Sequence, residues 1–118
     1  MTKRRWDVNL SAAVELDFAN ILDWTTQNFG ARQSQIYKGV LVQTIKELAA
    51  GPDVAGSKGM DEIMPGLRTL HVARRGRRGS HFLMYRTTAG QTIQIMRILH
   101  DKMDIQRDVS SDPDTIRE

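Results

Sequence analysis

The spacing of apolar residues changes partway along this chain, and the change limits the folds that the chain can adopt. From residue 11 to residue 49 apolar side chains recur three or four positions apart, as on one face of a helix. From residue 67 to residue 99 they fall into three short strand-like runs. Residues 51–66, rich in Gly, Pro, Asp and Ser, separate the two regions as a loop. The chain is therefore expected to be an α+β domain.

One strand and two helices are expected before the loop of residues 51–66. Residues 6–10 alternate apolar and polar side chains, the pattern of a strand with one buried face. Ser11 has the position of a helix N-cap, and the helix after it is expected to end at Gly30, which can adopt a positive φ. A second helix is expected over residues 31–49, before Gly51-Pro52. Two helices joined by so short a turn form an antiparallel hairpin.

The three strands are expected to form an antiparallel β-meander on which the helix hairpin packs. They cover residues 67–74, 81–87 and 92–99, and both connections are short and contain glycine, as β-hairpin loops do. Because side chains alternate between the faces of a strand, residue parity predicts which side chains share a face. On this basis one face holds Arg68, Leu70, Val72, Arg74, Phe82, Met84 and Arg86, and the other holds His71, Leu83 and Tyr85.

Positive charge is concentrated in the strand region. Between Glu62 and Asp101 the chain has no acidic residue and no lysine, but it has seven arginines and all three histidines. A guanidinium presents a planar fork of donors that matches a phosphate or a carboxylate. The partner is therefore expected to be anionic: a nucleic acid, an acidic protein segment, or each in turn. The loop carrying Arg74, Arg75, Arg77 and Arg78 either attracts that partner or keeps a sheet edge soluble.

Length and composition exclude several classes of protein. We expect a single domain over residues 1–109 of the 118, followed by a polar C-terminal tail, residues 110–118. The absence of cysteine excludes disulfides, thiolate catalysis and cysteine-based zinc sites. The basic N-terminus is not followed by the apolar stretch of a signal peptide, and no run approaches the roughly 18 apolar residues of a membrane span. A cytoplasmic protein without a membrane partner or a cofactor is expected.

A metal site was considered because His71 and His81 are expected to pair across the first β-hairpin. A structural zinc site needs four protein ligands, and a catalytic one needs three and an open position. The segment between Glu62 and Asp101 has no carboxylate to complete such a set. The sequence therefore predicts no metal site.

The order of the elements and several residue runs resemble the RelE/ParE superfamily of bacterial toxins, the toxin halves of two-gene toxin–antitoxin modules. The resemblance covers roughly residues 6–107, and the closing pattern, Arg97-Ile98-Leu99-His100-x-x-Met103-Asp104, is more similar to the ParE branch than to the RelE branch. The other matching runs are Asp17–Trp24, Phe29-Gly30, Leu48-Ala49 with Pro52, Pro65–Arg68, Phe82–Arg86 and Ile95-Met96.

The resemblance implies a small α+β toxin that is neutralised by an antitoxin whose C-terminal segment wraps it. In the ParE branch the typical target is DNA gyrase, which is poisoned without chemistry by the toxin itself. A ParD-like antitoxin with an acidic C-terminal segment and DNA gyrase are therefore the expected partners, with nucleic acid contacted only indirectly. The residues expected to bind target or antitoxin are Arg68, Arg74, Arg75, Arg77, Arg78, Arg86 and Arg97, together with Trp24 from the core or from a groove.

Two alternatives stay open from the sequence. The RelE branch cleaves messenger RNA on the ribosome, and the residues available for that chemistry are His100, Arg68, Arg86 and Arg97. Against it, no tyrosine follows Tyr85, and the ring of His100 can instead hydrogen-bond Asp101, Asp104 or a backbone carbonyl. Action without catalysis is therefore the expectation. The other alternative is a nucleic-acid-binding domain with no toxicity.

Overall fold

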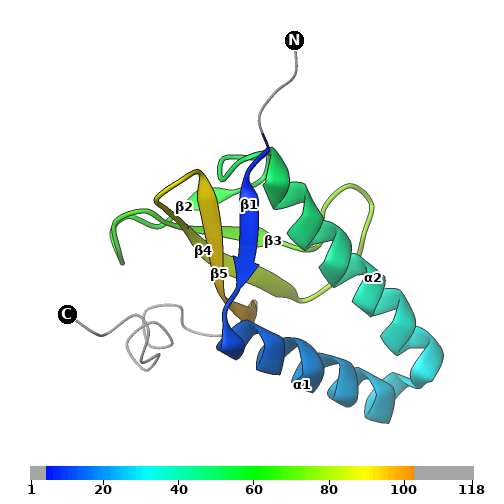
Figure 1. Ribbon diagram of the computed structural model, residues 1–118. Helices are drawn as coiled ribbons and strands as arrows, with labels where there is room; N and C mark the ends of the chain where they lie inside the picture. The colour runs from blue at the N-terminus through cyan, green and yellow to red at the C-terminus, as the bar shows by residue number, and fades with distance from the viewer. Residues whose placement is uncertain (1–4, 103–118) are drawn as a thin grey trace.

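The computed structural model describes residues 5–102, which form a five-stranded sheet and two long helices (Figure 1). The expected α+β arrangement, with both helices packed on the sheet, is confirmed. The residues assigned to the tail, 110–118, lie outside the described part of the chain. The elements are β1 (Asp7–Leu10), α1 (Ala12–Phe29), α2 (Ala31–Glu47), a 3-10 turn η1 (Leu48–Ala50), β2 (Lys58–Gly59), β3 (Leu67–His71), β4 (His81–Thr88) and β5 (Thr92–His100).

The sheet is mixed, with the order β1-β5-β4-β3-β2. Strands β2 to β5 form antiparallel pairs, so the expected meander is present and β2 adds a short edge to it. Strand β1 lies parallel to β5, with Asp7 opposite Thr92 and Leu10 opposite Ile95. The sequence did not predict this pairing, because nothing local in either strand marks the other as its neighbour.

Ser11 joins the start of α1 to the edge of β5. Its hydroxyl oxygen accepts the Val14 N–H at 3.1 Å, which satisfies one of the amides left open in the first helical turn. The same hydroxyl donates to the Met96 carbonyl at 3.0 Å. At the other end of α1, Gly30 has φ 95° and its N–H donates to the Thr26 carbonyl. The helix thus begins and ends where the sequence predicts.

Apolar side chains are buried on both faces of the sheet. The helices cover one face, where the core consists of Val14, Leu41, Leu48, Leu70, Val72, Leu83, Tyr85, Ile93, Ile95 and Ile98. The opposite face forms a smaller cluster of Leu67, Phe82, Met84, Met96 and Leu99, against which Met60, Ile63 and Met64 of the loop before β3 pack.

The predicted division of side chains between the two faces was wrong. Residues opposite each other on paired strands share a face, and the register places Leu70 opposite Leu83. Even-numbered residues of β3 therefore share a face with odd-numbered residues of β4, so Leu70 joins Tyr85 and not Met84. Parity holds within one strand, whereas the relation between strands depends on a register that the sequence does not state.

The carboxylate of Asp17, on α1, closes the part of β5 that β1 does not reach. It accepts from Arg97 Nε at 2.7 Å and Nη2 at 3.0 Å, and from the Ile98 backbone N–H at 3.0 Å. The Asp17 side chain is 12% exposed, so the carboxylate has exchanged most of its water for these three donors. This contact fixes α1 against the end of the sheet.

Replacing Asp17 with alanine is expected to lower the free energy of unfolding by about 2–3 kcal/mol, because the Arg97 fork and a backbone N–H lose their acceptor. Urea denaturation measures the loss. Asp23→Ala is the matched control, since Asp23 is an exposed carboxylate on the same helix and its loss should cost no more than about 0.5 kcal/mol. Equal losses in the two variants would contradict this role of Asp17.

Candidate functional site

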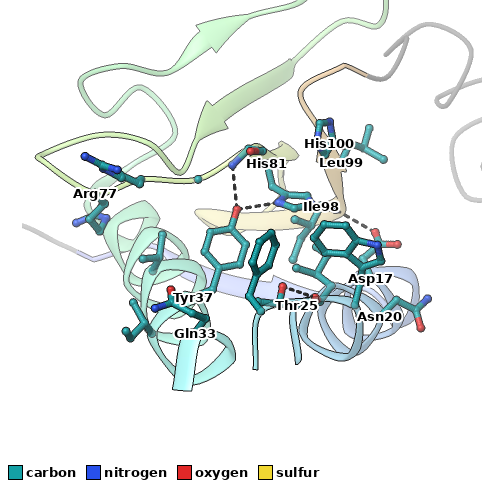
Figure 2. Close-up of a pocket in the computed structure, with 18 of the residues that line it drawn as sticks. Asp17, Asn20, Thr25, Gln33, Tyr37, Arg77, His81, Ile98, Leu99 and His100 are labelled. Carbon is teal, nitrogen blue, oxygen red and sulfur yellow. Dashed lines mark hydrogen bonds between the residues drawn. The ribbon is translucent and has the colours of Figure 1, made fainter. Parts of the chain in front are cut away.

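A groove of about 1050 Å³ opens between the two helices and the adjoining ends of β4 and β5 (Figure 2). The helix hairpin extends past the sheet toward Gly30, so its tip has no strand beneath it (Figure 1). The helices give the groove an apolar wall that includes Trp24, Phe29 and Ile36. The sheet and the loop before β4 give it a wall of arginines and histidines that includes Arg77, Arg78, Arg97, His81 and His100.

The apolar wall exposes large side chains. Trp24 is 57% exposed, Phe29 63% and Ile36 52%, and the Trp24 and Phe29 rings meet edge to face with centroids 5.7 Å apart. Phe29 continues the apolar spacing of α1, yet it is not buried because the hairpin tip has left the sheet. Neighbouring exposed apolar side chains of this size mark a surface that binds another molecule.

Glu47, at the end of α2, fixes the arginine loop that forms one rim of the groove. Its carboxylate accepts from Arg74 and, at 2.9 Å, from Arg77 Nη2, and Arg74 also donates to the Ala55 carbonyl. Burial alone would raise the pKa of Glu47, but the hydrogen bond and charge of Arg77 and the charge of Arg74 lower it. Arg75 and Arg78 remain exposed.

The first residues of this loop shorten β3. It ends at His71 and not at the expected Arg74, because the Arg74 N–H donates to the Val72 carbonyl and turns the chain away from the ladder. Two of the four loop arginines thus have a structural role that the sequence did not indicate. The loop presents Arg75 and Arg78 to solvent on a backbone held from α2.

The three histidines gather at the end of the sheet beside the groove. Asp101 joins two of them, with His71 Nε2 at 3.1 Å and His100 Nδ1 at 3.4 Å from its oxygens. The His81 and His100 rings meet edge to face with centroids 5.3 Å apart. The hydrogen bond from His71 holds the pKa of Asp101 below its usual value.

The expected pairing of His71 with His81 was wrong by one residue. The register sets His71 opposite Phe82, and His81 opposite His100. Within residues 5–102 no group of three or more histidines and carboxylates has an arrangement suited to a metal ion.

Tyr37 connects α2 to this histidine cluster, as Figure 2 shows. Its hydroxyl oxygen lies 2.7 Å from His81 Nδ1 and accepts the Ser80 N–H at 3.2 Å. Burial is the main cause of two pKa shifts: it raises the pKa of Tyr37 and, together with the nearby His100, lowers the pKa of His81 to about 4. Both groups are therefore neutral at pH 7. Because the Tyr37 oxygen already accepts the Ser80 N–H, and His81 Nδ1 is the acceptor within reach of its proton among the described residues, we assign the hydroxyl as the donor to the imidazole.

The residues named for catalysis in the nuclease alternative do not meet. Arg68 donates to the Pro52 carbonyl at 2.9 Å and to Ser57 Oγ at 2.7 Å. Arg86 lies opposite Leu67, whereas His100 lies opposite His81 at the other end of β4. Five residues of strand separate those positions, roughly 16 Å. Of the four residues, Arg97 and His100 line the groove.

The residues expected to bind target or antitoxin are distributed in the same way. Trp24, Arg77, Arg78 and Arg97 line the groove, Arg74 and Arg75 belong to the loop at its rim, and Arg68 and Arg86 lie far from it. Sequence reasoning missed the groove residues Asp17, Phe29, Ile36, Tyr37 and His81. The available signal was weak: each fits the ordinary pattern of a helix or a strand, and only the fold brings them together.

Gly79 is expected to be required for the closed end of the groove. A Cβ at this position would lie 2.5 Å from Val72 Cγ2 and 2.8 Å from the Tyr37 hydroxyl, so the loop would have to move away from α2. Gly79→Ala should cost about 1–3 kcal/mol of stability. Gly39→Ala, in the interior of α2 with nothing within 4 Å of the added Cβ, should instead stabilise by about 1 kcal/mol. Thermal unfolding of both variants tests the contrast, and a neutral Gly79→Ala would contradict it.

The His81–Tyr37 contact should make stability depend on pH. The pKa of His81 is about 4 in the folded chain and 6.5 ordinarily, so between these values the unfolded chain binds the additional proton. The free energy of unfolding should be highest above pH 6.5 and fall by about 2 kcal/mol from pH 7 to pH 5. Urea denaturation across that range should show most of this loss in His71→Gln and little of it in His81→Gln. A flat profile in the unmodified chain would contradict the assignment.

Comparisons with known proteins agree with this architecture. Among solved structures, the chromosomal ParDE toxin–antitoxin system of P. aeruginosa has a chain that superposes with a TM-score of 0.69, at 20% identity over 83% of this chain and 98% of the other. The toxin–antitoxin complex RelBE2 of Mycobacterium tuberculosis superposes with a TM-score of 0.54, at 18% identity over 81% and 98% of the two chains. At these identities the likeness establishes the fold.

Sequence comparison establishes the family. The model of the ParE toxin of the type II toxin–antitoxin system parDE matches residues 8–105. Toxin ParE1 of Mycobacterium tuberculosis is 36% identical over 100 residues, 85% of this chain and 94% of that protein. Toxin ParE of Escherichia coli is 33% identical over 96 residues, 81% and 85% of the two chains. The resemblance to the RelE/ParE superfamily is confirmed, and the chain belongs to the ParE toxin family of type II toxin–antitoxin systems.

Proposed function

We propose that this ParE-family toxin inhibits DNA gyrase by binding it, without catalysis, and that a cognate ParD-like antitoxin neutralises the toxin. The observation that carries the non-catalytic assignment is the separation of Arg68 and Arg86 from His100. The Arg97 fork, which a phosphate would need, is bound to Asp17. The proposed place of action is the cytoplasm, and none of the described helices is long and apolar enough to cross a membrane.

The groove is the proposed binding site of the antitoxin's acidic C-terminal segment. An amphipathic helix binds a groove through apolar anchors at positions i, i+3, i+4 and i+7. Trp24, Phe29 and Ile36 offer the apolar surface for such anchors, while Arg77 and Arg78 on the other wall suit the acidic side chains. Both solved structures that share the fold come from toxin–antitoxin systems, which supports the same kind of partner here.

The exposed side chains of Arg75 and Arg78 also act at a distance in this proposal. They project from a loop that Glu47 holds, so they attract an anionic partner at a distance while the apolar wall supplies close contact. Binding of the antitoxin should therefore weaken with added salt, since exposed charges are screened over about 8 Å at physiological ionic strength. Salt-insensitive binding would assign the affinity to the apolar contacts alone.

Expression of this chain alone should arrest growth, induce the DNA-damage response and leave transcripts intact. In vitro, the purified chain should inhibit supercoiling by gyrase. The family resemblance also predicts a short adjoining reading frame that encodes a ribbon–helix–helix protein with an acidic tail, and co-expression of this antitoxin should relieve the arrest. Codon-positioned transcript cuts that disappear in His100→Ala would favour the nuclease, and normal growth would favour a non-toxic nucleic-acid-binding domain.

Trp24→Ala should weaken binding of that antitoxin by about thirtyfold, roughly 2 kcal/mol, because the ring is the largest exposed anchor on the apolar wall. Leu16→Ala is the matched control: Leu16 is 62% exposed on the same helix but does not line the groove. Surface plasmon resonance compares the two dissociation constants. Equal weakening, or none in Trp24→Ala, would place the antitoxin elsewhere.

A further inference from the structure

The end of the groove that holds the histidines and arginines contains hydrogen-bond donors without an acceptor among the described residues. Tyr37 donates to His81 Nδ1, so the proton of the neutral imidazole lies on Nε2. None of the hydrogen bonds between side chains of residues 5–102 uses Nε2 of His81, which belongs to a residue that lines the groove. Arg77 Nε, on the same side of the groove, is also buried without an acceptor in the described part of the chain.

The carboxylates nearest to His81 are already engaged. Asp17 accepts from Arg97 and from the Ile98 N–H, and Asp101 accepts from His71. The other titratable or charged groups lining this end of the groove are Tyr37 from α2, Arg77 and Arg78 from the loop, and Arg97 and His100 from β5. The local charge is thus positive, and an incoming anion meets no free carboxylate of the described chain.

We propose that the His81–His100 end of the groove is a carboxylate-binding site, and that the antitoxin segment places an aspartate or glutamate there with uptake of a proton by the toxin. This proposal rests on the proposed function, because it takes the antitoxin as the occupant of the groove. Three observations carry it: the convergence of His81 and His100 on the groove wall, the unused donor of His81, and the positive charge of the surrounding loop.

The physical basis of the coupling is the cost of charging His81. Its pKa is lowered to about 4 by burial and by the nearby His100 and His71. A carboxylate beside the ring stabilises the imidazolium and so raises the pKa of His81 in the complex. By linkage, binding strengthens as pH falls through the raised pKa, by at most tenfold per pH unit for one proton.

The test is isothermal titration calorimetry of the full chain with the protein encoded by the adjoining reading frame. Titrations at pH 5.5, 6.5 and 7.5, each in two phosphate-free buffers that buffer at that pH and differ in ionisation enthalpy, count the protons taken up. The expected result is net uptake approaching one proton at pH 5.5, with a Kd that falls from pH 7.5 to pH 5.5. His81→Gln should abolish the uptake while binding persists.

His71→Gln is the matched control, because His71 belongs to the same cluster through Asp101 but does not line the groove. It should retain the proton uptake. A second measurement avoids reliance on variants: NMR of the ¹³C-labelled histidine rings should show the titration midpoint of His81 moving upward from about 4 in the free toxin when the complex forms.

The outcomes separate the two proposals. Binding without proton uptake, uptake that persists in His81→Gln, or an unshifted His81 midpoint would overturn the carboxylate site and leave the antitoxin groove intact. Proton uptake with a 20-base-pair DNA duplex but not with the protein would replace the carboxylate by a phosphate. No binding of the protein at any pH would overturn the proposed function and this inference together.

Discussion

The fold depends on how the fifth strand satisfies its outer edge. Strand β5 is buried on both faces, and along its outer edge β1 pairs only as far as Ile95. Beyond that point an unpaired backbone N–H would be buried or open to aberrant pairing. There, side chains from the start of α1 supply the hydrogen bonds: the Ser11 hydroxyl donates to the Met96 carbonyl, and the Asp17 carboxylate accepts the Ile98 N–H. Because the same helix then continues along one wall of the groove, this contact also fixes the point at which that wall leaves the sheet.

Arginine serves two purposes in this toxin. Arg68, Arg74, Arg77 and Arg97 bind carbonyls or carboxylates of the chain itself and hold loops and helices to the sheet. Within residues 5–102, Arg75 and Arg78 make no such hydrogen bond, and both remain exposed. The segment between Glu62 and Asp101 is therefore not uniformly a binding surface. The carboxylates that bind its arginines belong to α1 and α2, which precede it in the chain.

Much of the fold could be predicted from the sequence, and the errors have physical causes. The two ends of α1, at Ser11 and Gly30, and the two β-hairpins are local features, so residue spacing was enough to predict them. The pairing of β1 with β5, and the faces shared by Leu70 and Leu83, depend on register between separate segments. The site follows the same rule. Its arginines are conspicuous in sequence, but Tyr37 and His81 become a pair only through the approach of α2 to β4.

The parallel pairing of the first strand with the last one also affects synthesis. Asp7 has no sheet partner until Thr92 has been made, so the sheet cannot be completed while most of the chain is still untranslated. Closing so long a loop is slow compared with forming the helix hairpin. The helix hairpin therefore forms before the sheet that it covers is complete.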